Sequence, residues 1–295
     1  MKNSIYILLA GTLWGIISIF IKVLNSIGFN SLQCVAIRAF FSAVILFLYI
    51  FYKDKNKFKI ALKDIRYFLG TGICSIVLFN YCYFESIELI GGAAIPALLL
   101  YTAPIFVIIL SAIFFKERIT LRKFIALIIT FVGLGFVTGA FTAGERMSIM
   151  ALMLGLGSGL GYALYSIFGK LIVDKYDAIT ITFYTFLVAA ICVLPISGVV
   201  ENINLIVNWK GISASLGLAL FSTVLPFLLY TKGLHKVEAG KASILATVEP
   251  FVAAVIGVLL FNEKFTLIKI IGMIMILSAI IYLNSSSKNF DKTDN

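Results

Sequence analysis

Apolar runs of about 20 residues follow one another along nearly the whole chain, with short polar breaks between them. A helix of that length spans the hydrocarbon core of a bilayer, because each residue adds about 1.5 Å. The pattern predicts five such helices in the first half, at 4–24, 31–52, 67–87, 92–115 and 121–140. It predicts five more in the second half, at 148–172, 178–200, 211–232, 239–261 and 266–284. We therefore expect an all-α polytopic membrane protein with ten transmembrane helices.

The two halves of the chain carry similar sequences. The segment GTLWGIISIFIK at 11–22 returns as GLGYALYSIFGK at 159–170. The segment FKERITL at 115–121 returns as FNEKFTL at 261–267. Internal repeats of this kind are common in secondary transporters, which bind their solute where the repeats meet. The duplication is therefore a first indication of function as well as of ancestry.

The basic residues indicate that the two copies face opposite ways. Five spans per half is an odd number, so the second copy must enter the membrane from the other side. With the N-terminus inside, 18 of the 24 basic residues are cytoplasmic, 5 lie outside and Arg38 lies within the membrane. This bias follows the positive-inside rule and predicts that both termini are cytoplasmic. We expect inverted five-helix repeats at 1–143 and 144–287, followed by a polar tail at 288–295.

Composition excludes several classes of protein. The chain is 61% hydrophobic and 13% charged, with a mean hydropathy of +1.06, so no stretch outside the apolar runs could form a soluble domain. The net charge of +10 is scattered over the breaks between spans and forms no continuous surface for nucleic acid. The four cysteines fall inside apolar runs at no metal-binding spacing. We expect no metal, no cofactor and no nucleic-acid partner.

With these features the chain resembles transporters of the drug/metabolite transporter superfamily that contain two EamA-type domains. The resemblance rests on Gly11, Trp14 and Gly15, and on Arg38 in span 2. It rests as well on the repeated segments FKERITL and FNEKFTL, which we call the glutamate motifs. It also rests on Pro104 in span 4 and on Val-Glu-Pro at 248–250 in span 9. The resemblance implies a central cavity lined by spans 1–4 and 6–9, with spans 5 and 10 peripheral. It transfers no substrate-binding residue, because residues 5–13 lack the acid that the small four-span relatives carry there.

Two charged residues lie deep inside predicted spans, well away from the span ends. Glu249 is about 15 Å from either end of span 9, where a carboxylate is costly unless it is paired or protonated. It could couple transport to protons or cations, bind a cationic group of the substrate, or tie span 9 to a neighbouring helix. Arg38 lies about 12 Å from the outer end of span 2. It could bind a substrate carboxylate, pair with Glu249, or extend its side chain to the interface.

The remaining candidate side chains are aromatic or polar residues on several spans. Trp14 and Ser18 share one face of span 1, and the repeat places Tyr162 at the position of Trp14. The other candidates are Asn80, Tyr83, Tyr101, Tyr165, Ser166, Tyr184, Ser243 and Thr247. A cavity with these walls would suit a small amphipathic or aromatic solute. For each residue, packing within the bundle is the alternative.

Prolines and glycines are predicted to shape the bundle. Pro104 and Pro250 interrupt the helical hydrogen bonds of spans 4 and 9, so we expect structural or gating roles for both. Gly155 and Gly159 are four residues apart, a spacing that lets two helices approach closely. The glycine run at 155–161 does not match a nucleotide-binding loop, because it lies inside an apolar span.

These features favour a secondary transporter over an enzyme or a channel. The chain has no hydrolase motif and no Walker lysine motif, and it lacks the repeated filter loop of a channel. The leading hypothesis is export of a small metabolite, such as an amino acid or an amphipathic compound, by alternating access. The driving force would be a proton gradient or the solute's own gradient. Uptake and uncoupled facilitation are the alternatives. We expect a monomer in the cytoplasmic membrane of a bacterium.

Overall fold

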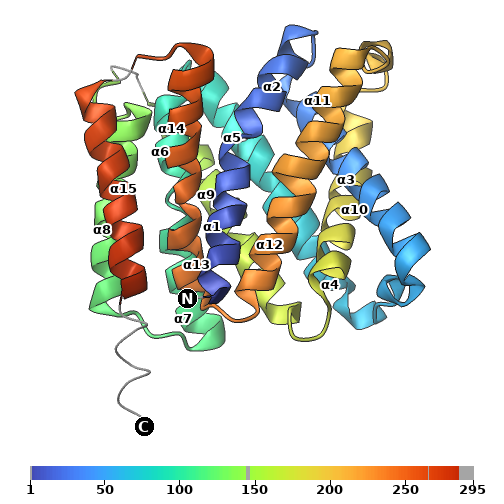
Figure 1. Ribbon diagram of the computed structural model, residues 1–295, viewed down its shortest axis with the longest axis horizontal. Coiled ribbons are helices and arrows are strands. Elements are labelled where there is room, and N and C mark those ends of the chain that lie inside the picture. Colours follow the sequence, from blue (N-terminus) through green and yellow to red (C-terminus); the bar gives the residue numbers. More distant parts are fainter. Residues whose placement is uncertain (1, 144–146, 265, 286–295) are drawn as a thin grey trace.

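Long helices lie side by side along one axis of the molecule (Figure 1). The computed structural model describes residues 2–143, 147–264 and 266–285. The predicted tail at 288–295, the start of the second repeat at 144–146 and Phe265 of the second glutamate motif lie outside the described residues.

Within the described residues, ten helical segments are long and apolar enough to span a membrane, which confirms the predicted fold class. The first five are Asn3–Ser26, Ser31–Lys53, Leu62–Ile90, Ala94–Phe115 and Leu121–Thr138. The second five are Ile149–Ile172, Ala178–Ser197, Trp209–Leu234, Ala239–Phe261 and Leu267–Ser285. Large apolar side chains such as Ile113 and Leu259 face outward with 67% and 70% of their surface exposed, as lipid-facing residues do.

Spans 1, 3, 4, 8 and 9 are each built from more than one helical element. The first half contains α1 (Lys2–Gly15), α2 (Ile17–Ser26), α3 (Ser31–Lys53), η1 (Lys55–Phe58), η2 (Leu62–Asp64), α4 (Ile65–Leu69), η3 (Gly70–Val77), α5 (Leu78–Ile90), α6 (Ala94–Leu100), α7 (Ala103–Phe115) and α8 (Leu121–Thr138). The second half contains α9 (Ile149–Ile172), α10 (Ala178–Ser197), η4 (Ile203–Leu205), α11 (Trp209–Ala219), η5 (Leu220–Val224), α12 (Leu225–Leu234), α13 (Ala239–Ala246), α14 (Val248–Phe261) and α15 (Leu267–Ser285).

Interruptions occur at corresponding places in the two halves. Span 4 breaks between α6 and α7, just before Pro104, and span 9 breaks between α13 and α14, just before Pro250. Proline has no backbone N–H and its ring crowds the preceding turn, which accounts for a break at each of these positions. Spans 3 and 8 each contain a π-helical segment, η3 and η5. Such segments shift the face that a helix presents and are frequent at functional sites.

The helices of the two halves also pack at corresponding places. Span 1 packs against spans 8 and 9, and span 6 packs against spans 3 and 4. Spans 2 and 7 pack together through α3 and α10, while α8 and α15 pair at one edge of the bundle (Figure 1). The first residues of α1 and the last residues of α15 lie at the same end of the bundle (Figure 1). We call this the terminal end, and the other the distal end.

Candidate functional site

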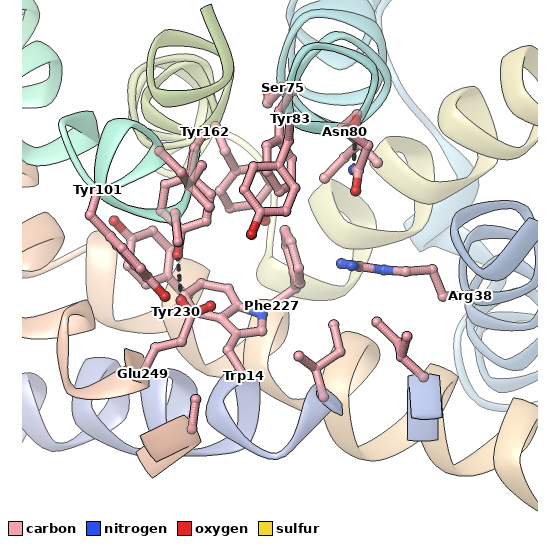
Figure 2. A pocket seen from close by; sticks show the side chains of 18 of the residues that line it. Trp14, Arg38, Ser75, Asn80, Tyr83, Tyr101, Tyr162, Phe227, Tyr230 and Glu249 are labelled. Atoms are coloured by element: carbon pink, nitrogen blue, oxygen red, sulfur yellow. Dashed lines mark hydrogen bonds between the residues drawn. The ribbon is translucent and has the colours of Figure 1, made fainter. Parts of the chain in front are cut away.

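A cavity of about 300 Å³ lies in the middle of the bundle, at the lower end of the range for small-molecule sites (Figure 2). Its lining residues come from spans 1, 2, 3, 4, 6, 8 and 9. Spans 5 and 10 contribute none, as the family resemblance implies. Span 7 also contributes none, contrary to the prediction. The lining reaches toward the distal end through Ile21 at the far end of span 1, Phe84 in span 3 and Ala253 in span 9.

Glu249 lies in the first turn of α14, directly after the break in span 9. The break follows from Pro250, and two glycines of α1 bring the first span against it. A Cβ at Gly11 would lie 2.8 Å from the carbonyl oxygen of Ala246, and one at Gly15 would lie 2.8 Å from that of Glu249. Only glycine allows this approach. Gly11 and Gly15 of span 1 thus help to position the buried carboxylate of Glu249.

Tyrosine hydroxyls surround the Glu249 carboxylate. Tyr162 of α9 donates a hydrogen bond of 3.0 Å to Glu249 Oε2 (Figure 2). Tyr101, at the break in span 4, points its side chain toward the same carboxylate (Figure 2). Hydrogen bonds to a charged acceptor are stronger than neutral ones, so they offset part of the cost of burying the carboxylate.

Arg38 enters the cavity from the side opposite Glu249 (Figure 2). The residue is 7% exposed, and its Nε atom is buried without a hydrogen-bond partner in the structure. The ion pairs between described residues do not join Arg38 to Glu249, so the pairing proposed from sequence does not form here. A buried guanidinium with an unused donor is poised to bind an anionic group.

Aromatic rings form the wall between the two charges. Trp14 lies edge-on to Tyr162 and Phe227, with centroid distances of 6.2 and 5.2 Å. Its centroid is 5.3 Å from that of Tyr230, whose hydroxyl is 2.7 Å from Ser166 Oγ. The Trp14 and Tyr162 pair predicted from the repeat is therefore a direct contact. These rings offer an apolar surface between a carboxylate and a guanidinium.

Nine of the thirteen residues predicted to bind substrate or ions line this cavity: Trp14, Arg38, Asn80, Tyr83, Tyr101, Tyr162, Tyr165, Ser166 and Glu249. The Asn80 side-chain amide donates to Ile76 O at 2.7 Å, and the Tyr165 hydroxyl lies 2.7 Å from Thr231 Oγ1.

Four predicted residues lie elsewhere. The Tyr184 hydroxyl donates to Phe58 O at 2.7 Å, because the side chain faces the η1 segment and not the cavity. Ser243 and Thr247 donate to carbonyl groups one turn back in their own helix. Ser18 has a buried hydroxyl without a partner but does not line the cavity. None of these four residues lines the cavity.

Eleven lining residues were not anticipated, and five of them are polar or aromatic: Ser75, Phe79, Phe84, Phe227 and Tyr230. These five lie in or after the π-helical segments of spans 3 and 8, where the wider turn changes which residues face inward. Regular helical spacing cannot find them. The repeat could have indicated Tyr230, because span 8 is the counterpart of span 3 and Tyr230 aligns close to Tyr83, a predicted lining residue.

The cavity chemistry fits noncovalent binding of a small solute. A cation could contact Glu249 and the tyrosine rings, and an anion could contact Arg38. Among the described residues, no group of three or more His, Cys, Asp or Glu side chains is arranged to hold a metal ion.

Comparisons with known proteins agree with this architecture. The model of the EamA-like transporter family matches residues 1–139 and again residues 149–285. An uncharacterized transporter of Archaeoglobus fulgidus is 30% identical over 95% of this chain and 98% of its own length. An uncharacterized inner membrane transporter of Salmonella typhimurium is 25% identical over 97% of this chain and 96% of its own.

Two further similarities are more distant. An S-adenosylmethionine uptake transporter of Rickettsia felis is 22% identical over 98% of this chain and 97% of its own length. A crystal structure of a chain with 12% identity has the same fold, with a TM-score of 0.78 over 98% of this chain and 99% of that one. Together with the ten spans and the double match, these similarities show that the chain is a multi-pass membrane transporter and belongs to the EamA-like transporter family.

Proposed function

We propose that the protein is a secondary transporter that exports a small metabolite, such as an amino acid or an amphipathic compound, by alternating access. The observation that carries this proposal is the central cavity, which holds Arg38 and Glu249 on opposite sides of an aromatic wall. Its size suits a small solute, and its lining joins both repeats. The family match also supports transport.

The two charges suggest the chemistry of the solute. A molecule with an ammonium group and a carboxylate would place the ammonium group at Glu249 and the carboxylate at Arg38, with its apolar part against Trp14 and Phe227. Binding would then satisfy the Arg38 Nε atom, which has no partner in the structure.

Direction and driving force are part of the proposal. Glu249 could also carry a proton, since a buried carboxylate among tyrosine hydroxyls can be stabilised in either protonation state. The driving force would then be a proton gradient or, without coupling, the solute's own gradient. Uptake is the second candidate, favoured by the similarity to the S-adenosylmethionine uptake transporter of Rickettsia felis.

The proposed setting is a bacterial cytoplasmic membrane, with both termini cytoplasmic and the protein acting as a monomer. The corresponding breaks in spans 4 and 9 and the corresponding packing of spans 1 and 6 support inverted repeats at 1–143 and 144–287. The loop charges support the orientation. The terminal end would then face the cytoplasm and the distal end the outside.

A metabolite comparison tests the proposal. Cells producing the wild-type protein or the Glu249→Gln variant are grown in parallel, and solutes inside the cells and in the medium are measured. We expect at least one small zwitterionic or amphipathic solute to be depleted inside and enriched outside only with the wild-type protein. Accumulation inside would support uptake.

Matched tyrosine variants make the test specific to the cavity. Tyr162→Phe removes a hydroxyl that binds Glu249, whereas Tyr184→Phe removes one that binds Phe58 O outside the cavity. Only Tyr162→Phe is expected to change the export of that solute. No difference in any solute between wild type and Glu249→Gln, at equal protein levels, would contradict the proposal.

A further inference from the structure

The two copies of the glutamate motif have the same local backbone. The motif glutamates, Glu117 and Glu263, follow α7 and α14 respectively. Each helix ends at a left-handed residue, Lys116 with φ 57° and Asn262 with φ 54°. The next N–H bonds back into the helix, from Glu117 to Ser111 O at 3.3 Å and from Glu263 to Gly257 O at 3.1 Å. The repeat therefore presents two glutamates from equivalent turns, one near each end of the bundle (Figure 1).

The two carboxylates make different contacts. Glu117 accepts hydrogen bonds from the backbone N–H groups of Ala239 at 2.7 Å and Gly240 at 3.1 Å. Its side chain is 8% exposed. Glu263 accepts a hydrogen bond of 2.9 Å from Lys269 in its own half, and its side chain is 45% exposed. One glutamate thus bridges the two halves, and the other stays within its own half.

The Glu117 contact joins parts of the protein that alternating access must separate. Ala239 and Gly240 begin α13, where the first N–H groups of the helix have no partner within the helix. The two hydrogen bonds to the carboxylate therefore link the end of span 4 to the start of span 9. Lys123 strengthens the same junction, since its Nζ lies 2.7 Å from Glu238 Oε2 and 3.8 Å from Glu117 Oε2.

The junction residues Glu117, Lys123, Ala239 and Gly240 do not line the cavity. The cavity lining extends from Tyr230 and Ser166 toward the distal end, whereas α7 ends and α13 begins at the terminal end (Figure 1). Near this junction Lys170 of α9 donates to Leu234 O of α12 at 2.6 Å, a contact within the second half. In this structure spans 4 and 9 are therefore linked at the terminal end, while the cavity extends toward the distal end.

The repeat assigns Glu263 a corresponding partner at the distal end. The counterparts of Ala239 and Gly240 are Ala93 and Ala94, at the start of span 4. Within the described residues, the N-cap residue of α6, Ala93, makes no side-chain capping hydrogen bond, and a Cβ added at the nearby Gly91 would meet no atom within 4 Å. Space is therefore free where a second junction would form.

We propose that Glu117 and Glu263 are alternating gate latches: Glu117 holds the terminal end closed, and Glu263 closes the distal end by binding the backbone N–H groups of Ala93 and Ala94. In that second state Glu117 leaves Ala239 and Gly240, and Glu263 leaves Lys269. Neither residue touches the solute; each sets which end of the cavity is open. The proposal rests on the alternating access of the proposed function.

The test measures the accessibility of both ends without any substrate. Two reporters, Ala97→Cys in the cavity lining and Ser243→Cys one turn beyond Gly240, are placed singly in a protein whose four natural cysteines are replaced by alanine. A water-soluble maleimide labels purified protein in detergent, where the reagent reaches both ends. Each reporter is combined with Glu117→Ala, Glu117→Gln or Glu263→Ala.

Glu117→Ala is expected to raise the Ser243→Cys labelling rate about tenfold or more and to lower that of Ala97→Cys, because two hydrogen bonds to a charged group are lost. Glu117→Gln keeps one acceptor oxygen and should give an intermediate change. Glu263→Ala is the matched control, and it should leave Ser243→Cys labelling at or below the wild-type rate. Melting curves and gel filtration identify variants that fail to fold.

Unchanged labelling in a folded Glu117→Ala protein would overturn the proposal, and so would an equal rise in Ser243→Cys labelling with Glu263→Ala. The labelling result stands apart from the proposed function. Shifted labelling without any transported solute would refute the transport proposal alone, while a transported solute without shifted labelling would refute the latches alone.

Discussion

Replacing Gly159 by alanine should destabilise the protein, because this glycine packs on the break in span 4. A Cβ at Gly159 would lie 2.5 Å from Thr102 Oγ1, 2.9 Å from Leu99 O and 3.1 Å from Leu100 O. The two carbonyl oxygens belong to the backbone and cannot rotate away. Relief therefore requires that α6 and α9 move apart by a few tenths of an ångström. The same contact explains the close helix approach that the glycine spacing predicted.

The net effect combines two opposing terms. Overpacking in a well-packed core typically costs about 1–3 kcal/mol. Alanine recovers up to about 1 kcal/mol because it favours the helix more than glycine does. A contact of 2.9 Å to a backbone oxygen places the cost in the upper part of that range, about 2–3 kcal/mol. We therefore expect Gly159→Ala to lower the free energy of unfolding by about 1–2 kcal/mol, and Tm by several degrees.

Gly157→Ala is the matched control in the same helix. Its added Cβ would lie 3.3 Å from Cys82 Sγ, a side-chain atom that can shift, so we expect no loss of stability. Gly11→Ala should behave like Gly159→Ala, since its Cβ would lie 2.8 Å from Ala246 O at the break in span 9. Melting curves of the purified variants in one detergent provide the comparison. Equal melting temperatures for Gly159→Ala and Gly157→Ala would refute the reasoning.

Three further outcomes are expected. Tyr230→Phe should lower the free energy of unfolding by about 0.5–1.5 kcal/mol, measured by thermal melting, because Ser166 loses its hydroxyl partner. Arg38→Lys should weaken binding of an anionic solute less than Arg38→Gln, because lysine keeps the charge but not the planar donor pair; saturation binding of the identified solute would check the order. The hydrogen bond with Asp64 raises the pKa of Lys175, so its stabilising effect is present at neutral pH and is lost as the pH rises through that pKa. Asp64→Asn should therefore lower Tm at neutral pH and weaken the fall of Tm at alkaline pH.

Hydrophobic runs and prolines were enough to predict the spans and their interruptions. Ten apolar runs correspond to ten helical spans, because a bilayer fixes both the length and the polarity of a crossing helix. Pro104 and Pro250 marked the breaks in spans 4 and 9 for a local chemical reason, the missing N–H. These features depend on short stretches of sequence, which is why they could be predicted without the structure.

The cavity was harder to predict because it depends on which helix face turns inward. Trp14 and Tyr162 were found because the repeat places them at equivalent positions. Tyr230 and Phe227 were not predicted to line the cavity, because the π-helical turn before them changes which residues of the span face inward. Tyr184 was misplaced because nothing in its own span shows that η1 packs against it. The separation of Arg38 from Glu249 likewise depends on the packing of several spans.

Counterflow in proteoliposomes tests the central claim most directly. Vesicles containing the purified protein are loaded with the solute found in the metabolite comparison and diluted into a trace of labelled solute. Alternating access through the central cavity should make internal solute accelerate the influx of label in wild type, and much less in the Glu249→Gln variant. An influx that is insensitive to internal solute and does not saturate would indicate an open channel and contradict the account.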